Sequence, residues 1–457
     1  MMETGKRETS ATVPVALVRK LLHRGARSNL AKIFIKAYPV DVARLLSMLG
    51  SAERAQAFTV LLEECEVSHV ASVLSEMAAD DSLGLLERLD PKKIAGLLSE
   101  MPTDDATFLA SRLPDPLAAQ VIALMEAQLA AGVRELLEHE ERTAGRIMTP
   151  DYFALQEDVT VSEAITALQR RNEEYEMVFY VYVVDKRDHL VGVVSLRKLL
   201  TTPPSYQLKR IMVPDVISAR TSADQQEVAR LVAEYNLLAI PIVSDEDKLV
   251  GIVTVDDVID VLQEEVAEDL LALAGVTAEE RVNTGAVRSL RLRAPWLLVN
   301  LGTAFLASLV VSQFEDQISA RPALAAIMPI VAGMGGNSAT QTLTVVIRGM
   351  ALGELTDVSW VTLKAIIVGA GNGLLTGSVG AIVAALYYRN IWLGVVLASA
   401  LVINMIIGGI AGTLVPVILR KLHVDPAVAS SVFVTACTDV AGFLTFLGLA
   451  TLLMRLL

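Results

Sequence analysis

The stretch SSVFVTACTDVAGFLTFLGLATLLM, residues 430–454, decides the fold class of the C-terminal part of the chain. It is apolar or small except at Asp439, and it exceeds the roughly 20 residues that a helix needs to cross a bilayer. At a rise of about 1.5 Å per residue, Asp439 lies roughly 20 Å from residue 426, near the bilayer centre. A carboxylate there costs roughly 2.5–3.5 kcal/mol on insertion scales. The stretch therefore predicts a membrane-spanning helix whose single carboxylate has a functional role.

Further charge-free runs of similar length lie upstream, at residues 294–314, 322–347, 365–388 and 391–419. Asp439 is the only charged residue inside any of the five runs, although the whole chain has a net charge of −13. The pattern predicts an acidic soluble half followed by a membrane domain of five helices, residues 294–457. Cys65 and Cys437 fall in different halves, so we expect no disulfide between them.

The basic residues predict the orientation of the membrane domain, because Lys and Arg gather in the cytoplasmic loops. They flank the first run, the loop after the second run and the loop after the fourth run: Arg288, Arg291, Arg293, Arg348, Lys364, Arg420 and Lys421. We therefore expect a multi-pass protein of the plasma (inner) membrane, with its soluble half in the cytoplasm and its C-terminus outside. Residues 1–20 have no signal-peptide pattern and are expected to be disordered.

Residues 21–144 contain a helical repeat. VASVLSEMAADD at 70–81 recurs as IAGLLSEMPTDD at 94–105, and a repeat of this length predicts a small superhelix of short helices. Acidic residues dominate this domain, Glu63, Asp104 and Asp105 among them. A solvated surface explains any one of them, but clustered carboxylate oxygens also suit a hard divalent cation.

A second repeat begins at Arg146 and again at Arg210, with RIMTPD matched by RIMVPD. Each copy continues with a capped helix, a strand, a turn, a second strand and a helix. Residues 145–263 thus resemble a tandem pair of CBS domains, and this resemblance implies an α/β module that often dimerises and often binds adenine nucleotides. Thr254 and Asp257 fit the nucleotide pattern of the second copy, so ATP is a candidate ligand. The first copy has Lys198 where that carboxylate would stand.

Residues 264–293, EEVAEDLLALAGVTAEERVNTGAVRSLRLR, begin acidic and end basic. They predict a long connecting helix that delivers the chain to the first span. The stretch is either a passive linker or, through Glu264 and Glu265 beside the bilayer, a place where a cation is sensed.

The second span carries PIVAGMGGNSATQTLTVVIRGMALGE, residues 329–354. Polar residues recur there at spacings of three and four and so share one helix face: Gly333, Asn337, Thr340, Gln341, Thr344 and Arg348. In lipid such a face meets other helices or water, so it either joins helices or lines a pore. Gly335 and Gly336 allow close backbone approach.

The fifth span places Ser431, Thr435 and Asp439 on one face at intervals of four, with Gly442 continuing it. Asp439 is either protonated and hydrogen-bonded, part of a proton relay, or the attractor of a cation in a watery path. We favour the cation, because no Lys, Arg or His lies in any run to pair with it or relay its proton. A two-fold dimer would bring two such carboxylates together. Few charges among many small polar groups suit hydrated Mg²⁺, which dehydrates reluctantly.

The whole chain resembles the MgtE family of magnesium channels or transporters. The order of its parts matches, and the second-span stretch GMGGNSATQTLTVVIRGMALGE and TDVAGF around Asp439 look like signatures of that family. The resemblance implies a homodimer with a pore between the two membrane domains and a main Mg²⁺ site at Asp439. It also implies closure of the pore by Mg²⁺ on cytoplasmic carboxylates. Ser431 departs from relatives that carry an amide at its position.

By motif position, the resemblance assigns three groups of residues. The gating Mg²⁺ would be held by Glu264 or Glu265 and Asp425. Candidate cytoplasmic sensor residues are Glu63, Asp104, Asp105, Asp256 and Asp260, and candidate pore-lining residues are Asn337, Gln341, Gly335, Gly336, Ser431 and Thr435. The fold class that follows is multidomain: an all-α superhelical N-domain, an α/β tandem CBS pair, a long connecting helix and a five-helix all-α transmembrane domain.

The predicted function is a Mg²⁺-selective, channel-like importer that closes when cytoplasmic Mg²⁺ is high. The alternative is a gradient-coupled secondary transporter of divalent cations such as Mg²⁺ and Co²⁺, although five spans fit the inverted repeat of such carriers poorly. An enzyme is not expected, because no His or Cys constellation lies in the spans. The expected partners are a second copy and the lipid bilayer, and nucleic acid is not among them.

Overall fold

The computed structural model describes residues 14–170, 178–277, 280, 282, 284–351, 354–355, 357–422, 424 and 426–453, without the side chains of residues 269, 273 and 426–430. The chain divides into two compact units, Met1–Leu262 and Gln263–Leu457. Residues 1–13 lie outside the described residues. The prediction of disorder for residues 15–20 is wrong, because they begin helix α1 (Val15–His23) and Val18 is fully buried there.

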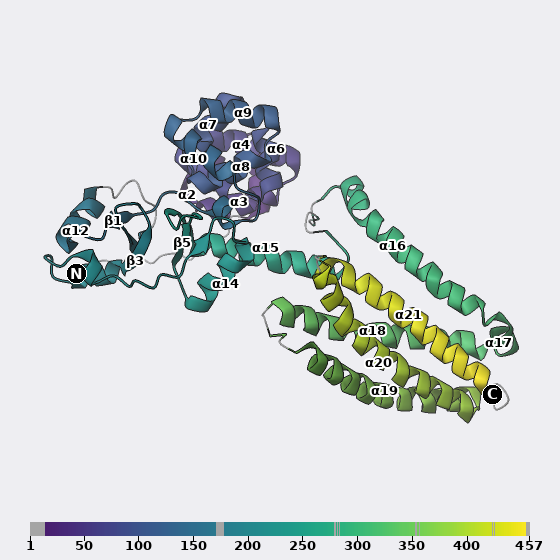
Figure 1. Cartoon of the computed structure of the whole chain (residues 1–457). Coiled ribbons are helices and arrows are strands. Elements are labelled where there is room, and N and C mark those ends of the chain that lie inside the picture. The colour runs from purple at the N-terminus through teal and green to yellow at the C-terminus, as the bar shows by residue number, and fades with distance from the viewer. Residues whose placement is uncertain are drawn as a thin grey trace, which may run out of the picture. The chain divides into compact units, whose positions relative to one another are not determined.

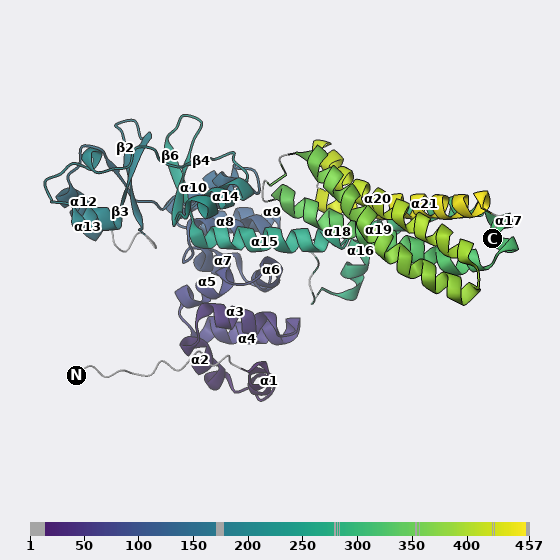
Figure 2. The ribbon, with the colours of Figure 1, turned by 90° about the horizontal axis from the view of Figure 1, so that it is seen from below.

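The N-terminal part of the first unit is a stack of short helices (Figure 2). After α1 come α2 (Arg27–Lys36), α3 (Pro39–Ser47), α4 (Ser51–Glu64), α5 (Val67–Ser75), α6 (Ala79–Leu86), α7 (Pro91–Leu98), α8 (Thr103–Arg112), α9 (Asp115–Leu124) and α10 (Ala127–Leu137). Proline and aspartate separate the helices: Asp90 caps α7 by accepting from the Lys92 amide, and Pro91 occupies the first helical position. The predicted all-α superhelical N-domain is confirmed.

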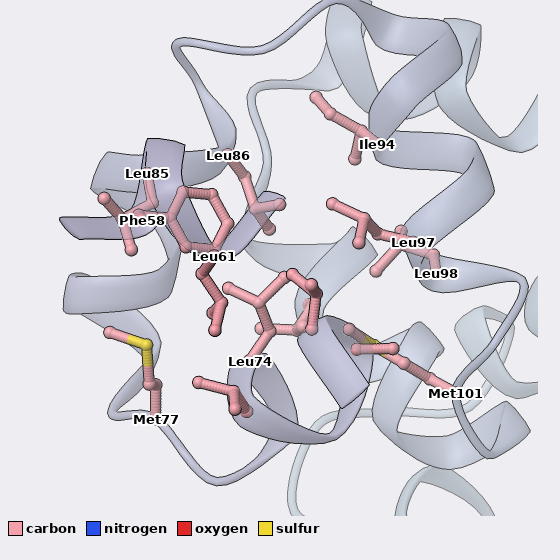
Figure 3. Close-up of a cluster of buried hydrophobic side chains, with 14 of the residues drawn as sticks. Phe58, Leu61, Leu74, Met77, Leu85, Leu86, Ile94, Leu97, Leu98 and Met101 are labelled. Carbon is pink, nitrogen blue, oxygen red and sulfur yellow. The ribbon is translucent and has the colours of Figure 1, made fainter. Parts of the chain in front are cut away.

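The internal repeat places equivalent residues in one core (Figure 3). Leu74 and Leu98, 24 positions apart, are both fully buried. Met77 and Met101 repeat the same relation and are nearly fully buried. Each short helix therefore buries its apolar side against its neighbours, since none is long enough to be stable alone.

Two copies of one α/β unit follow. The first contains α11 (Ala144–Ile147), β1 (Ala154–Gln156), α12 (Val161–Arg170), β2 (Tyr180–Val184), β3 (Leu190–Ser195) and α13 (Leu196–Thr201). The second contains the turn η1 (Leu208–Arg210), β4 (Ala219–Arg220), α14 (Gln225–Tyr235), β5 (Ala239–Val243) and β6 (Leu249–Thr254). The two sheets have the orders β1-β2-β3 and β4-β5-β6, with the first pair parallel and the second antiparallel in each. The strands β1 and β4 were not predicted, because they are too short to show an alternation.

The predicted connecting helix is divided in the structure. Helix α15 (Val255–Leu273) starts directly after β6 and continues through Glu264 and Glu265. It ends before Gly275, whose φ of +70° is a left-handed conformation that terminates helices. The basic residues of the stretch belong to the next helix, α16 (Ala286–Ser312).

Among its described residues, the second unit contains five helices that are long and apolar enough to cross a membrane. They are α16, α18 (Ala323–Ala351), α19 (Val358–Tyr388), α20 (Ile391–Lys421) and α21 (Pro426–Leu452), and the short α17 (Glu315–Ala320) joins the first two. Helices α18 to α21 lie side by side (Figure 1). In the most apolar segment of α20, 56% of the residues are buried, against 6% in that of α16. Helix α20 is therefore at the centre of this bundle. Helix α16 lies at its margin, in contact with α21.

Helices α19 and α20 are in backbone contact through glycine. A Cβ added at Gly373 would lie 2.6 Å from the Val402 Cα, and one at Gly369 would lie 2.6 Å from the Met405 carbonyl oxygen. Small residues permit this approach in lipid, where packing rather than the hydrophobic effect holds helices together.

Candidate functional site: a polar path in the membrane unit and an acidic face in the first unit

The polar stripe of α18 lies on one exposed face of that helix. Gly333, Asn337, Gln341 and Arg348 are exposed, as are Thr340 and Thr344, whereas residues between them such as Ala339 and Leu343 are fully buried. The hydroxyls of Thr340 and Thr344 donate to the oxygens of Gly336 and Thr340 in the preceding turn, at 2.9 Å each. Because exposed amides inside a bilayer require water or another polar helix, this face is unsuited to lipid.

On α21, the residues that were predicted to share one face differ in their exposure. Thr435 is exposed, Ser431 and Asp439 are half-buried, and Gly442 is buried. The Thr435 hydroxyl donates to the backbone oxygen of Ser431 at 2.8 Å. The lone pairs of the Thr435 hydroxyl oxygen therefore stay available to a cation or its water. Gly442 instead faces the bundle, where it contacts Asn404.

The two glycines proposed from the sequence as pore-lining occupy different surroundings. Gly336 is half-buried, with open space where a Cβ would be. Gly335 is buried against the side chain of Asn404 on α20. In the sequence, Asn404 is visible only as a polar residue of the fourth charge-free run, and its contact with Gly335 could not be predicted.

The first unit has an acidic face built by three helices far apart in sequence. Asp104 and Asp105 lie in the first turn of α8, Asp256 and Asp257 in the first turn of α15, and Glu76 directly after α5. Burial, Asp257 and Asp105 raise the pKa of Asp104 well above its usual value. Burial raises the pKa of Asp257 to about 6, with Asp256 and Asp105 adding to it.

The neighbouring carboxyls are affected in the same direction. Burial together with Asp260 and Asp256 raises the pKa of Asp105, and burial together with Asp260 and Asp105 raises that of Glu76. Burial and Asp256 raise the pKa of Asp260. Burial is the main cause of each shift, and repulsion between the ionised carboxylates adds to it. A divalent cation would relieve that repulsion.

Asp104 contributes a buried oxygen, Oδ1, that has no hydrogen-bond partner in the part of the chain that the structure describes. Among the described residues, however, no group of three or more His, Cys, Asp or Glu side chains is arranged to hold a metal ion. The face is therefore a set of carboxyls on separate helices rather than an assembled site. Glu63, also predicted as a sensor residue, is engaged elsewhere, because its Oε2 accepts from Arg27 at 3.0 Å.

The predicted nucleotide residues contact each other. The Thr254 hydroxyl donates to Asp257 Oδ2 at 2.5 Å, so the hydroxyl and carboxylate that a nucleotide needs are together at the end of β6. In the first copy the Ser195 hydroxyl accepts from the Lys198 amide at 3.2 Å, and no carboxylate stands at that position. The donor set fits a nucleotide in the second copy alone.

The predicted gating residues lie on α15 and before α21. Glu264 is exposed and Glu265 is half-buried. Asp425 lies outside the described residues.

Three sequence families match the chain in the order of its parts. They are the MgtE intracellular N domain at residues 37–142, the CBS domain at 144–204 and 208–264, and the MgtE divalent cation transporter domain at 328–449. The chain is 39% identical to the magnesium transporter MgtE of Bacillus subtilis over 336 residues, which cover 72% of this chain and 74% of the relative. It is 38% identical to that of Thermus thermophilus over 337 residues, 73% and 74% of the two chains.

A solved structure also matches part of the chain. It is the cytosolic domain of the Mg²⁺ channel MgtE in complex with ATP, with a TM-score of 0.50 and 34% identity, and the match covers 54% of this chain and 100% of the other.

Proposed function

Because the chain belongs to the MgtE family of divalent cation transporters, we propose that it conducts Mg²⁺ into the cytoplasm along a channel-like path past Asp439. The family is one of ion transporters rather than enzymes. The observation that carries the proposal is the half-buried Asp439 beside the exposed Thr435, in a set of charge-free runs without a basic residue. Such a carboxylate is costly unless it meets a cation or a proton.

The ligand chemistry favours a hydrated ion. A carboxylate, hydroxyls and amides can hold the water shell of Mg²⁺, whereas a softer metal would favour Cys or His. We propose that a second copy of the chain completes the path, so that two Asp439 carboxylates flank it and the stripe of α18, with Asn337 and Gln341, borders water. Ser431, Thr435, Gly335 and Gly336 stay in the proposed lining.

We further propose that cytoplasmic Mg²⁺ closes this path by binding to the acidic face. The raised pKa values of Asp104, Asp105 and Asp260 support this step, because a cation that neutralises repelling carboxylates favours the arrangement in which they are close. Several weak sites acting together would make the response steep. Glu63, Asp256, Glu264, Glu265 and Asp425 remain candidates for the other cytoplasmic sites.

We also propose the boundaries of the domains and the side of the membrane on which each domain lies. The N-domain at 21–144, the CBS pair at 145–263 and the connecting segment at 264–293 would lie in the cytoplasm, and residues 294–457 would cross the plasma (inner) membrane. The basic residues before the first span favour this orientation. ATP would bind at Thr254 and Asp257, the pair that fits a nucleotide, and a relative's cytosolic domain was solved with ATP.

The test is Mg²⁺ influx into proteoliposomes under a Mg²⁺ gradient alone, for wild type, Asp439→Asn and Asp316→Asn. We expect Asp439→Asn to lose influx by about tenfold or more, because it removes the charge that attracts the ion. Asp316→Asn, which removes an exposed carboxyl of α17 outside the charge-free runs, should conduct like wild type.

Equal influx through wild type and Asp439→Asn would refute the path. Influx that requires an imposed proton or sodium gradient would instead favour the gradient-coupled carrier. Loading the vesicles with Mg²⁺ should reduce influx through wild type beyond the loss of driving force, and an absence of that reduction would refute closure by cytoplasmic Mg²⁺.

A further inference from the structure

Asn404 is a fully buried amide at the centre of the membrane unit. It lies on α20, its exposed fraction is 0%, and its Nδ2 donates a hydrogen bond of 3.0 Å to the backbone oxygen of Val331 on α18. An amide at this depth costs more to insert than a leucine, and in membrane helices such residues link one helix to another. Asn404 therefore joins α20 to α18 by a directional contact.

Glycines on two neighbouring helices make room for this amide. A Cβ at Gly335 of α18 would overlap Nδ2, and a Cβ at Gly442 of α21 would lie 2.5 Å from it. Neither glycine can be replaced without displacing the Asn404 side chain, because a real Cβ does not approach so closely. The amide is wedged among α18, α20 and α21 and holds the three helices in one register.

Both glycines lie close to the proposed ion path. Gly442 follows Asp439 by three residues, about one helical turn, and Gly335 precedes Asn337 by two. A shift of the amide would therefore move the Asp439 carboxylate relative to the polar stripe of α18. The contact thus connects the two helices whose polar residues must act together on one ion.

The oxygen of the Asn404 amide indicates that the residue does more than stabilise the helix packing. Asn404 Oδ1 is buried and has no hydrogen-bond partner among the described residues. An apolar side chain of similar volume would avoid this orphaned acceptor, so the amide has a purpose other than favourable packing.

We propose that Asn404 is a positioning residue that fixes Asp439 against the polar stripe of α18 and thereby sets the affinity of the path for Mg²⁺. This inference rests on the proposed function of Asp439. The effect is indirect, since Asn404 acts through the placement of α21 and not by contact with the ion.

The experiment measures influx into proteoliposomes as a function of Mg²⁺ for wild type, Asn404→Leu, Gly442→Ala and Thr413→Val. We expect Asn404→Leu and Gly442→Ala to raise the half-saturating Mg²⁺ concentration about threefold to tenfold, the range that an interhelical hydrogen bond is worth. Thr413→Val is the matched control. Thr413 is also fully buried on α20, but its hydroxyl donates within its own helix, to Gly409 at 2.9 Å, so its removal should leave the half-saturating concentration unchanged.

A fall in maximal influx at an unchanged half-saturating concentration, in proportion to the amount of folded protein, would show that Asn404 is only structural and would overturn the proposal. If Asn404→Leu does not fold, the smaller Asn404→Ala gives the same comparison, and a folded Asn404→Ala with a wild-type half-saturating concentration would also overturn it. Asp439→Asn is measured alongside. Unchanged influx in that variant refutes the path itself, whereas its loss together with a wild-type response of the Asn404 variants refutes this inference alone.

Discussion

Asp104 and Asp257 lie in different domains of the first unit. Burial raises the pKa of both carboxyls, and Asp257 adds to the rise in the pKa of Asp104. A carboxyl whose pKa is higher in the folded state than in the unfolded state destabilises the fold when it ionises. Its penalty is absent below the unfolded value near 4 and complete above the folded value, which for Asp257 is about 6. The contact of α8 with α15 should therefore weaken as the pH rises through about 4 to 6, and cations and protons should compete for it.

We predict that Asp104→Asn strengthens this contact in Mg²⁺-free protein. At pH 7.5 the protection of α8 and α15 from hydrogen exchange should rise, because the substitution removes a buried negative charge that Asp257 and Asp105 repel. The added protection that Mg²⁺ gives to wild type should shrink in the variant. The measurement is hydrogen exchange of the full-length protein, corrected for intrinsic rates, with Glu87→Gln as an exposed control of the same domain. Lower protection in Asp104→Asn than in wild type would contradict the repulsion.

At the scale of single residues, the sequence predicted those whose chemistry is unusual for their position. Asp439 was conspicuous because charge is absent around it, and the stripe of α18 because helical spacing puts its members on one face. The partners of Asp104 could not be predicted, because Asp257 is more than 150 residues away. Asn404 and Gly442 were visible only as polar or small residues, since the contact between them depends on how the helices pack.

At the scale of elements, the contact of α19 with α20 depends on the absence of side chains. A Cβ at Gly373 would meet the backbone of Val402, which cannot move aside as a flexible side chain could. Gly371 is on the same helix, and a Cβ there would meet nothing within 4 Å. The two glycines therefore separate the effect of packing from that of helix propensity, which favours alanine at either position.

We predict that Gly373→Ala destabilises the membrane unit by about 1–3 kcal/mol, the usual cost of overpacking, and that Gly371→Ala does not. The measurement is the temperature at which detergent-solubilised protein loses its monodisperse elution. If both variants lose monodisperse elution at the same temperature, the close contact of α19 with α20 at Gly373 does not contribute to stability.

The sequence predicted the long apolar helices of the membrane unit better than it predicted where helices begin and end. The five spans are long and uniform in hydropathy, so their existence was predictable and only their ends were not: α16 begins at Ala286, among basic residues that a hydropathy criterion excludes. The division of residues 264–293 was missed because its acidic and basic parts both favour a helix, while the left-handed conformation of Gly275 interrupts it.

At the scale of the whole molecule, the chain passes from the first unit into the second within α15 and then reaches α16 through the segment between these two helices. Glu280 is buried in this segment, and its carboxylate accepts hydrogen bonds from Ser289 at 2.6 Å and from Arg293 Nε at 2.8 Å. Both donors lie in the first two turns of α16. The joining segment is thus anchored to the helix that enters the membrane, and any change in the first unit that reaches the spans along the chain passes this anchor.

We predict that Arg293→Gln weakens closure by internal Mg²⁺ without reducing influx at low internal Mg²⁺. The substitution leaves the buried Glu280 charge without its ionic partner, so the segment should detach from α16. The internal Mg²⁺ needed for half-closure should then rise by roughly fivefold or more, the smallest coupling expected between linked sites. Arg291→Gln, which removes the same charge from the same stretch of α16 at an exposed position, is the control. If both variants close at the wild-type concentration, the anchor does not transmit the signal. If both shift equally, the effect is one of membrane-surface charge rather than of the Glu280 contact.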